Sequence, residues 1–284
     1  MKRDNSFKCF SLTLIWCWLL LFALLPFTLV VIASFLSHSS NHLLQLPFTL
    51  ANYAELHHSI YLKIFKNSAI VAGWCTLLCL LLGYPFAYAI ARMQNRYKYF
   101  LILLIIIPFW TSSLIRSYAL IAIIKAKGIL NTLLLAMGII NQPLSILFTN
   151  TAVIIGLVYN LLPFMILPIL INVERLDDRL IDAARDLGAN RLTTFRKVIL
   201  PLTMPGIIAG CTLVFLPAMT IFYIPDILGG ARSVLLGNLI QNQFLIAQNW
   251  PLGSVISIIL TLLLMTLLLV YWLSMHRNRT REWL

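Results

Sequence analysis

One carboxylate stands at the end of a long apolar run, where its charge would be costly. Asp226 follows the sequence Ile-Phe-Tyr-Ile-Pro at 221–225 and precedes a glycine pair at 229–230. Because proline and glycine interrupt helices, we expect the helix to break here. An ionisable residue near membrane depth usually faces a bundle interior or water. Asp226 is therefore a candidate for attracting a cation. The alternative is a structural partner for Arg232 or for a backbone N–H at the break.

Aromatic side chains near the ends of other apolar runs could supply ring faces to a cation. Such a contact stabilises a cation by about 0.5–2 kcal/mol. The alternative for each ring is packing or anchoring at the membrane interface. Arg116 would repel a cation, and we expect it to pair with a carboxylate or carbonyl or to extend toward the interface. The candidate rings are Phe109, Trp110, Tyr159 and Tyr223.

Residues that could build a metal centre or a catalytic site are few. Cys75 and Cys79 share a helix face, but small packing residues explain them better than a metal pair. The His57-His58 pair is a weak metal candidate, so we expect no metal and no cofactor. The sequence contains no G-x-x-x-x-G-K-[ST], H-E-x-x-H or G-x-S-x-G. We therefore predict that the chain is not an enzyme and that any ATP site belongs to another protein.

The composition places these residues in a membrane protein. Of the 284 residues, 61% are hydrophobic and 11% are charged, whereas soluble domains carry about 25% charged residues. The net charge of +12 comes from Lys and Arg between the apolar runs. Positive charge in that position orients membrane helices, so we expect contact with lipid and none with nucleic acid.

Six apolar runs are long enough to cross a hydrocarbon core of about 30 Å as helices. The first is too long for the core of a signal peptide, so we expect it to be retained. The stretch at 129–148 is interrupted by Asn141-Gln142-Pro143, and we predict a short surface or re-entrant helix there. The predicted spans are 12–36, 68–91, 100–124, 152–172, 205–227 and 255–274.

The distribution of basic residues supports this topology. With both termini inside, the inside segments carry 15 Lys or Arg and leave 6 on or near the outside. A seventh span at 129–148 would move the basic segment 173–204 outside and break the positive-inside bias. We therefore predict one multi-pass domain over residues 1–284, in the cytoplasmic membrane, with cytoplasmic termini and a cytoplasmic loop at 173–204.

The inside loop contains a short amphipathic helix with both ends marked. Asp177 or Asp178 can accept from the first backbone N–H groups. Leu180, Ala184 and Leu187 form an apolar stripe, and a following glycine at 188 favours the left-handed conformation that ends many helices. Such a helix suits a groove in a partner protein. The alternative is a solvated helix that rests on its own bundle.

A second short helix is predicted after that glycine. Leu192, Phe195 and Ile199 share one side, and Pro201 and Pro205 mark the start of the next span. In that span, glycines at 206 and 210 form a G-x-x-x-G pattern. Small residues at this spacing permit close packing of membrane helices.

This loop resembles the EAA loop of ABC importer permeases, whose pattern is Glu-Ala-Ala, three residues, Gly, nine residues, Ile, one residue, Leu-Pro. The spacing here is complete, although Asp182 replaces Glu and Val198 stands at the Ile position. The resemblance implies that the loop docks into a cleft of an ATPase subunit and carries its motion into the membrane. The residues implied for this coupling are Asp182, Ala183, Ala184, Arg185, Gly188, Leu200 and Pro201.

Further segments resemble the spermidine/putrescine permeases, and the B-type permease most of all. They include Gly83–Tyr88, Pro108–Arg116, Pro225–Gly230 and Gly237–Ile240. The resemblance implies an all-α, MetI-like ABC permease fold and a polyamine substrate. It also implies three kinds of partner: an ATPase dimer, a second permease of the C type, and an extracytoplasmic polyamine-binding protein.

Two other functions compete with polyamine import. An ABC permease for another small solute, such as thiamine or an inorganic ion, would carry the same loop, and Asp226 with the aromatic residues favours a cation only weakly. A stand-alone secondary transporter usually places ionisable residues near the membrane midplane. Acidic residues within the predicted spans are too few for that class, and the EAA-like loop would have no purpose in it.

Overall fold

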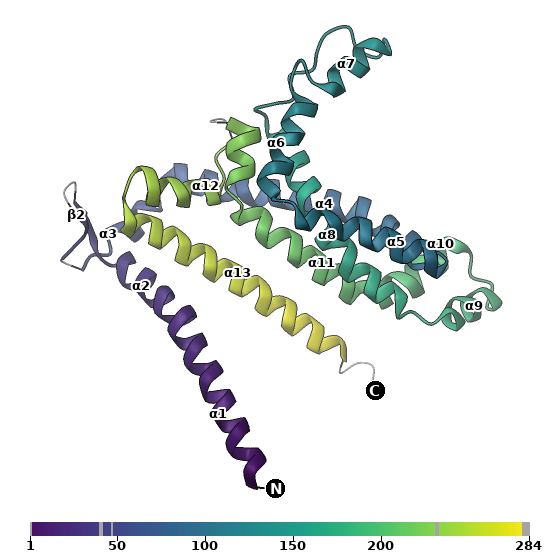
Figure 1. The fold of residues 1–284 in the computed structure, drawn as a ribbon, viewed down its shortest axis with the longest axis horizontal. Coiled ribbons are helices and arrows are strands. Elements are labelled where there is room, and N and C mark those ends of the chain that lie inside the picture. The colour runs from purple at the N-terminus through teal and green to yellow at the C-terminus, as the bar shows by residue number, and fades with distance from the viewer. Residues whose placement is uncertain (1, 40–41, 47, 231–232, 280–284) are drawn as a thin grey trace. The chain divides into compact units, whose positions relative to one another are not determined.

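The computed structural model describes residues 2–39, 42–46, 48–230 and 233–279. Helices account for nearly all of them, which confirms the all-α prediction apart from one small hairpin (Figure 1). The chain forms two compact units, one of residues 1–62 with 239–265 and the other of 63–238 with 266–284. Each unit is described by itself.

The first unit begins with three consecutive helical segments whose apolar side chains are mostly exposed. An outer surface of this kind suits lipid better than water. A β-hairpin and a short helix follow, and Asn52 joins them to the first helices by donating to the carbonyls of Ser34 and Leu36. The elements are α1 (Lys2–Leu19), η1 (Leu20–Leu24), α2 (Leu25–Ser34), β1 (Ser37–Ser39), β2 (His42–Gln45), α3 (Ala51–Glu55), η6 (Asn242–Ile246) and the first part of α13 (Trp250–Arg279).

The second unit holds most of the remaining helices. Two of its segments, η3 and η4, are π-helical turns, and η2 is a 3₁₀ turn. The elements are α4 (Ser59–Ala91), α5 (Asn95–Ile106), η2 (Ile107–Trp110), α6 (Ser113–Ile124), α7 (Ile129–Ala136), α8 (Asn150–Glu174), α9 (Asp178–Asp186), α10 (Arg191–Thr194), η3 (Phe195–Ile199), α11 (Leu200–Thr220), η4 (Pro225–Gly229) and α12 (Leu236–Gln241).

The core of the second unit is the packing of α8 against α11. A Cβ atom on Gly206 would lie 2.8 Å from the side chain of Asn172 and from the carbonyl oxygen of Pro168. A Cβ atom on Gly210 would lie 2.7 Å from the sulfur of Met165. The G-x-x-x-G pattern therefore does bring two helices into close contact, as its spacing predicts.

Six described helical segments are long and apolar enough to cross a membrane. The third of these, Ser113–Ala136, differs from the predicted third span at 100–124, because it joins α6 with α7. Residues 100–124 are divided in the structure: α5 ends, η2 follows, and Thr111 and Ser112 are extended. Pro108 explains the break, since it has no N–H to continue a helix.

The ambiguous stretch at 129–148 contains the short helix α7 followed by a folded loop. Buried Asn131 closes this loop, because its Nδ2 donates to the carbonyls of Lys125 and Leu144 and its Oδ1 accepts from the Leu144 N–H. The fifth apolar run also breaks, but at Ile221 and Phe222, ahead of the predicted position: α11 ends at Thr220, and Pro225 starts the π-helical turn η4. Both breaks leave irregular backbone at the ends of helices.

Candidate functional site

The helix α9 is defined at both ends by its own sequence. Asp177 caps the first turn, and its Oδ1 accepts from the Arg179 N–H at 3.0 Å. At the other end Gly188 has a φ of +79°. The Gly188 N–H donates to the Arg185 carbonyl and the Ala189 N–H to the Ala184 carbonyl. These two bonds form a Schellman motif, which satisfies carbonyls that the last turn would leave open.

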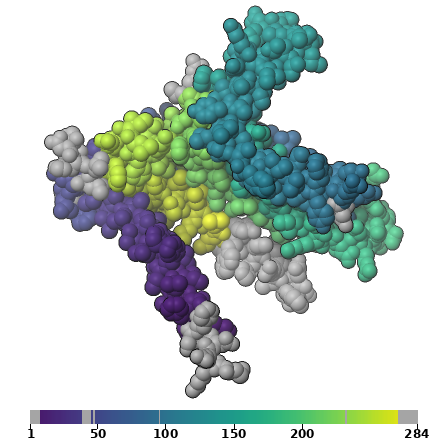
Figure 2. Space-filling model, in the orientation of Figure 1, coloured from purple at the N-terminus to yellow at the C-terminus, as the bar shows by residue number. Residues whose placement is uncertain are grey.

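The two faces of α9 have different surroundings. Ile181 is 6% exposed and is the side chain that holds the helix to the rest of the second unit. The predicted stripe lies beside Ile181 and is less covered: Leu180 is exposed, Ala184 is half-buried, and Leu187 is 89% exposed. In the space-filling view the segment around α9 lies at the surface of this unit (Figure 2). The helix thus presents uncovered leucine side chains.

The segment after α9 differs from the prediction of a separate short helix. Asn190 caps its start by accepting from the Thr193 N–H at 2.8 Å. From there α10, η3 and α11 run without interruption to Thr220. Pro201 causes no break because it lies at the start of α11, directly after the π-helical turn η3. The part of the loop after Asn190 is therefore helically continuous with the next apolar helix.

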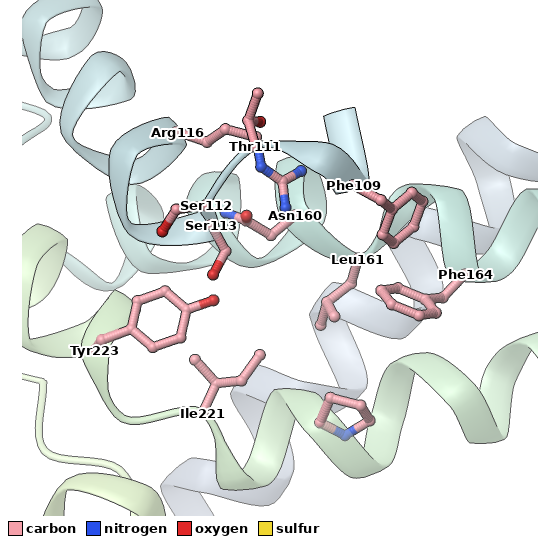
Figure 3. Close-up of a pocket in the computed structure, with 11 residues that line it drawn as sticks. Phe109, Thr111, Ser112, Ser113, Arg116, Asn160, Leu161, Phe164, Ile221 and Tyr223 are labelled. Atoms are coloured by element: carbon pink, nitrogen blue, oxygen red, sulfur yellow. The ribbon is translucent and has the colours of Figure 1, made fainter. Parts of the chain in front are cut away.

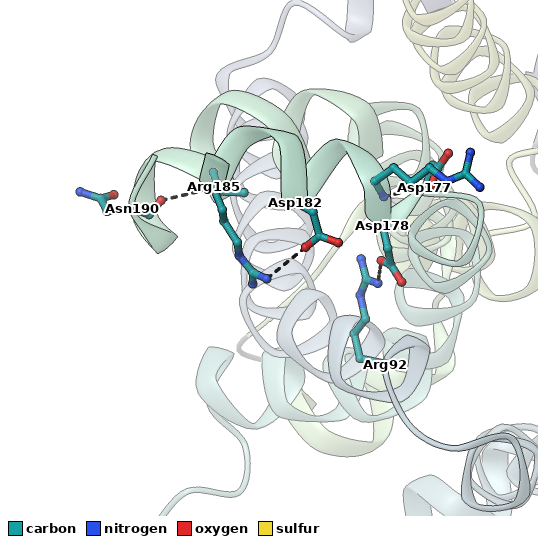
Figure 4. A network of polar contacts seen from close by, with 8 residues as sticks. Arg92, Asp177, Asp178, Asp182, Arg185 and Asn190 are labelled. Atoms are coloured by element: carbon teal, nitrogen blue, oxygen red, sulfur yellow. Dashed lines mark hydrogen bonds and ion pairs between the residues drawn. The ribbon is translucent and has the colours of Figure 1, made fainter. Parts of the chain in front are cut away.

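Ion pairs surround the start of α9 (Figure 4). Asp178 pairs with Arg92, which lies just beyond the end of α4. Partial burial opposes the charge on Arg92, but the hydrogen bond to Asp178, the negative charge of Asp178 and the nearby Tyr88 together outweigh it and raise the pKa of Arg92. Asp182 accepts from Arg185 at 3.4 Å within the helix. These charges line a small hollow of about 290 Å³ together with Ile181.

The residues implied for coupling are brought together on and beside this loop. Asp182, Ala183 and Arg185 are exposed on α9, where a partner could reach them. Leu200 is half-buried and Pro201 is exposed at the start of α11. Their coupling role stays a prediction, but each one lies on the single continuous segment that joins α8 to α11.

A separate pocket of about 460 Å³ lies among α6, α8 and the end of α11 (Figure 3). Phe109 and Phe164 contact each other edge to face, with centroids 5.0 Å apart, on one side. Arg116, Ser112 and Ser113 lie on the other side. The remaining lining residues are Thr111, Asn160, Leu161, Pro217, Ile221 and Tyr223.

Two buried polar atoms at this pocket are without a partner among the described residues. Asn160 is 3% exposed, and its Nδ2 donates to the Gly156 carbonyl at 2.9 Å. Its Oδ1 accepts no bond, and neither does the Nε of Arg116 donate one, within the part of the chain that the structure describes. An unpartnered buried acceptor is costly, so Asn160 is a candidate to contact a ligand. Sequence reasoning missed it, although a polar residue within a long apolar run was the available signal.

Only part of the predicted substrate path meets at this pocket. Phe109 and Tyr223 line it. Trp110 is 82% exposed and Tyr159 is also exposed, and neither lines the pocket. Asp226 lies outside it as well, and its Oδ1 accepts from the Nδ2 of Asn238. The other partner considered for Asp226, Arg232, lies outside the described residues.

Residues 80–282 match the family model described as "Binding-protein-dependent transport system inner membrane component". The chain belongs to this family. It is 50% identical over 269 residues to the spermidine/putrescine transport system permease protein PotB of Haemophilus influenzae, covering 95% of this chain and 94% of that one. It is 49% identical to the Escherichia coli protein of the same name, covering 90% and 93%.

A solved structure agrees with the fold of a binding-protein-dependent permease. A chain of a bacterial ABC transporter involved in the import of the acidic polysaccharide alginate superposes with a TM-score of 0.78. The match covers 97% of this chain and 96% of that one, at 16% identity. At that identity the likeness concerns the fold alone. The chain is therefore a multi-pass inner-membrane permease, with six candidate membrane-spanning helices among the described residues.

Proposed function

We propose that this permease moves polyamines, spermidine or putrescine, into the cytoplasm as one subunit of an ATP-driven importer. The observation that carries the proposal is the identity of about 50% to spermidine/putrescine permeases over nearly the whole chain. Chains this similar share their fold and, as a rule, the side chains that line a path. ATP hydrolysis belongs to a separate subunit, because this sequence has no phosphate-binding loop.

The loop around α9 is the proposed docking element for that ATPase. Its inner face is held by Ile181, while Leu180 and Leu187 are uncovered. An amphipathic helix with an uncovered apolar side is the form in which helices enter grooves on partners. One permease supplies one such helix. A dimeric ATPase therefore requires a second permease with its own loop, which the C-type subunit would supply.

The proposed topology puts the ATPase on the cytoplasmic side, and delivery by an extracytoplasmic binding protein gives the inward direction. The basic residues concentrate in the segments that include the α9 loop and both termini. The positive-inside rule then puts these segments in the cytoplasm, where ATP is. An extracytoplasmic binding protein would deliver the polyamine at the opposite side.

The pocket is the proposed first contact for the substrate within the membrane part. Phe109 and Tyr223 offer ring faces, and the free Oδ1 of Asn160 can accept from an ammonium group. Arg116 weakens the hold on a cation, since it carries the same charge. A transport site must bind its substrate weakly enough to release it. A site whose affinity for a cation is lowered by Arg116 therefore suits transport better than tight binding would. Trp110, Tyr159 and Asp226 remain proposed members of the path outside this pocket.

Arg116 also favours a second candidate function, the import of an anion. No Asp or Glu lines the pocket among the described residues, so the guanidinium is its only formal charge. An anionic solute would gain from that charge, whereas a polyamine would not. The relatives of known name favour the polyamine, and the pocket's charge favours the anion.

Uptake in the native host separates the two candidates. Deleting this gene should abolish ATP-dependent uptake of labelled spermidine or putrescine, and restoring the gene should recover it. Uptake of phosphate, sulfate and thiamine measured in the same cells serves as the control and should not change. Normal polyamine uptake with loss of another solute would overturn the proposed substrate.

A further inference from the structure

One face of α4, continued by Arg92 just beyond its end, contacts the coupling loop (residues 173–204) at two places. The paired residues are 86 and 119 positions apart in the sequence. Tyr84, Tyr88 and Arg92 follow one another at intervals of four. Residues at this spacing lie on one side of a helix, one above the other. Tyr84 contacts Phe195 and Thr203, Arg92 contacts Asp178, and Tyr88 packs against Arg92.

The first contact joins Tyr84 to η3 and to the start of α11. Tyr84 is buried, and its hydroxyl is 3.0 Å from the Oγ1 of Thr203 in α11. Its ring meets the ring of Phe195 in η3 edge to face, with centroids 5.7 Å apart. Edge-to-face pairs are favourable and directional, so they fix relative position as well as adding stability.

The second contact joins Arg92 to the start of α9. Its guanidinium pairs with Asp178, the first residue of α9, and lies 5.5 Å from the centre of the Tyr88 ring. A carboxylate at a helix N-terminus is also favoured by the helix dipole. Tyr88, Arg92 and Asp178 line the same hollow as Ile181, the buried side chain of α9.

A second ion pair continues this arrangement beyond the end of α4. Lys98, in the first turn of α5, pairs with Glu174 at the end of α8 at 2.9 Å. Arg92 and Lys98 therefore hold the segment from Glu174 to Asp178 at its two ends. Exposed ion pairs add little stability singly, but two pairs across one short turn restrict how that turn can move.

We infer that α4 receives the motion of the coupling loop through Tyr84 and Arg92, which act as positioning residues for transport. The inference rests on the proposed function, because it needs an ATPase seated on the outer face of α9. Displacement of α9 would then pull on α4 as well as on α8 and α11, the helices that the loop joins directly. Coupling between sites can be carried by packed side chains and ion pairs, and these contacts link α9 to α4 in that way.

Reversing the charge on Arg92 tests the link without touching the docking face. We compare Arg92→Glu, Asp178→Arg, the double exchange, and Arg92→Lys, each in the purified complex with its ATPase. Arg96→Glu is the control, because Arg96 lies four residues further on, exposed in the first turn of α5, and forms no ion pair among the described residues. The measurement is spermidine transported per ATP hydrolysed in proteoliposomes supplied with the extracytoplasmic binding protein, with the amount of assembled complex recorded for each variant.

Arg92→Glu should lower transport per ATP about fivefold or more, the low end of typical coupling between sites. The double exchange should restore most of the transport per ATP, and Arg92→Lys should retain most of it. Arg96→Glu should match wild type. Tyr84→Phe, which removes only the hydroxyl, should cause a smaller loss of spermidine transported per ATP.

Two results would overturn the inference. One is an Arg92→Glu complex that transports per ATP as the Arg96→Glu complex does. The other is a loss of assembled complex that accounts for all of the lost transport and is not recovered by the double exchange. A wild-type preparation that holds no ATPase would instead overturn the proposed function, and this inference with it.

Discussion

Replacing Gly188 with valine should detach the ATPase from the permease. Gly188 has a φ of +79°, and a Cβ atom there would meet nothing within 4 Å. The cost is therefore conformational alone, with no steric clash in the permease itself. The left-handed region costs an L-residue about 1–2 kcal/mol, and a β-branched residue tolerates it least. Since about 1.4 kcal/mol is tenfold, the properly ended α9 should fall roughly 5–30-fold in population relative to competing conformations.

The assay is the amount of ATPase that co-purifies with the permease in detergent, together with polyamine uptake. Gly188→Asn should retain most of both, because asparagine visits the left-handed region more readily. Gly138→Val is the matched control: its φ is +69°, with nothing within 4 Å of a Cβ atom, but it lies beyond α7 and away from α9. It should leave ATPase binding intact.

Normal ATPase binding and uptake in Gly188→Val would refute this reasoning. It would show that the Schellman end of α9 is not needed for docking. An equal loss in Gly138→Val would also contradict it, because backbone strain anywhere would then suffice.

Three further predictions concern topology, packing and the substrate path. A cysteine at Asn190 should resist impermeant thiol reagents in intact cells, because the positive-inside bias puts the α9 loop in the cytoplasm. Gly210→Val should lower the free energy of unfolding by about 1–3 kcal/mol, as overpacking does, because its Cβ would press on Met165; thermal unfolding in detergent measures this. Asp226→Asn can still accept from Asn238 and should keep the fold, but it should reduce uptake of spermidine, with three charges, more than uptake of putrescine.

Each of these has a control and a contrary result. The Asn190 cysteine should label once the cells are opened, and ready labelling beforehand would overturn the topology. Gly73→Val is the control for Gly210→Val, since a Cβ atom at Gly73 meets nothing within 4 Å. Equal destabilisation by the two substitutions would contradict the packing argument. For Asp226→Asn, equal loss of both polyamines in proportion to the loss of complex would remove Asp226 from the substrate path.

Local chemistry made the ends of α9 predictable. The side chain of Asp177 caps its start and Gly188 takes the left-handed conformation, as the residue types indicate. The close packing at Gly206 follows in the same way from a residue small enough to let its neighbours approach, whereas the break after α11 comes at Ile221 and Phe222, before the proline and glycines that predicted it. Length and hydropathy were sufficient for the number of spanning helices.

Features that depend on tertiary contact were not predictable. The contact of Tyr84 with Thr203 joins residues far apart in the sequence, and no local pattern marks it. The burial of Ile181, next to a stripe of equally apolar residues, depends on which side of α9 faces the other helices. The break at Pro108 was missed because the apolar run continues on both sides of it, so hydropathy alone indicates one span. Asn160 was missed for a similar reason, as one polar residue scarcely lowers the hydropathy of its run.

ATP-driven polyamine import is tested most directly by reconstitution. The complex that co-purifies with this permease is placed in proteoliposomes, and labelled spermidine uptake is measured with ATP, with a non-hydrolysable analogue, and with an ion gradient alone. We predict accumulation of spermidine only with hydrolysable ATP and only when an extracytoplasmic binding protein is added. Accumulation driven by the ion gradient without ATP, or ATP-driven uptake of an anion with none of spermidine, would contradict it.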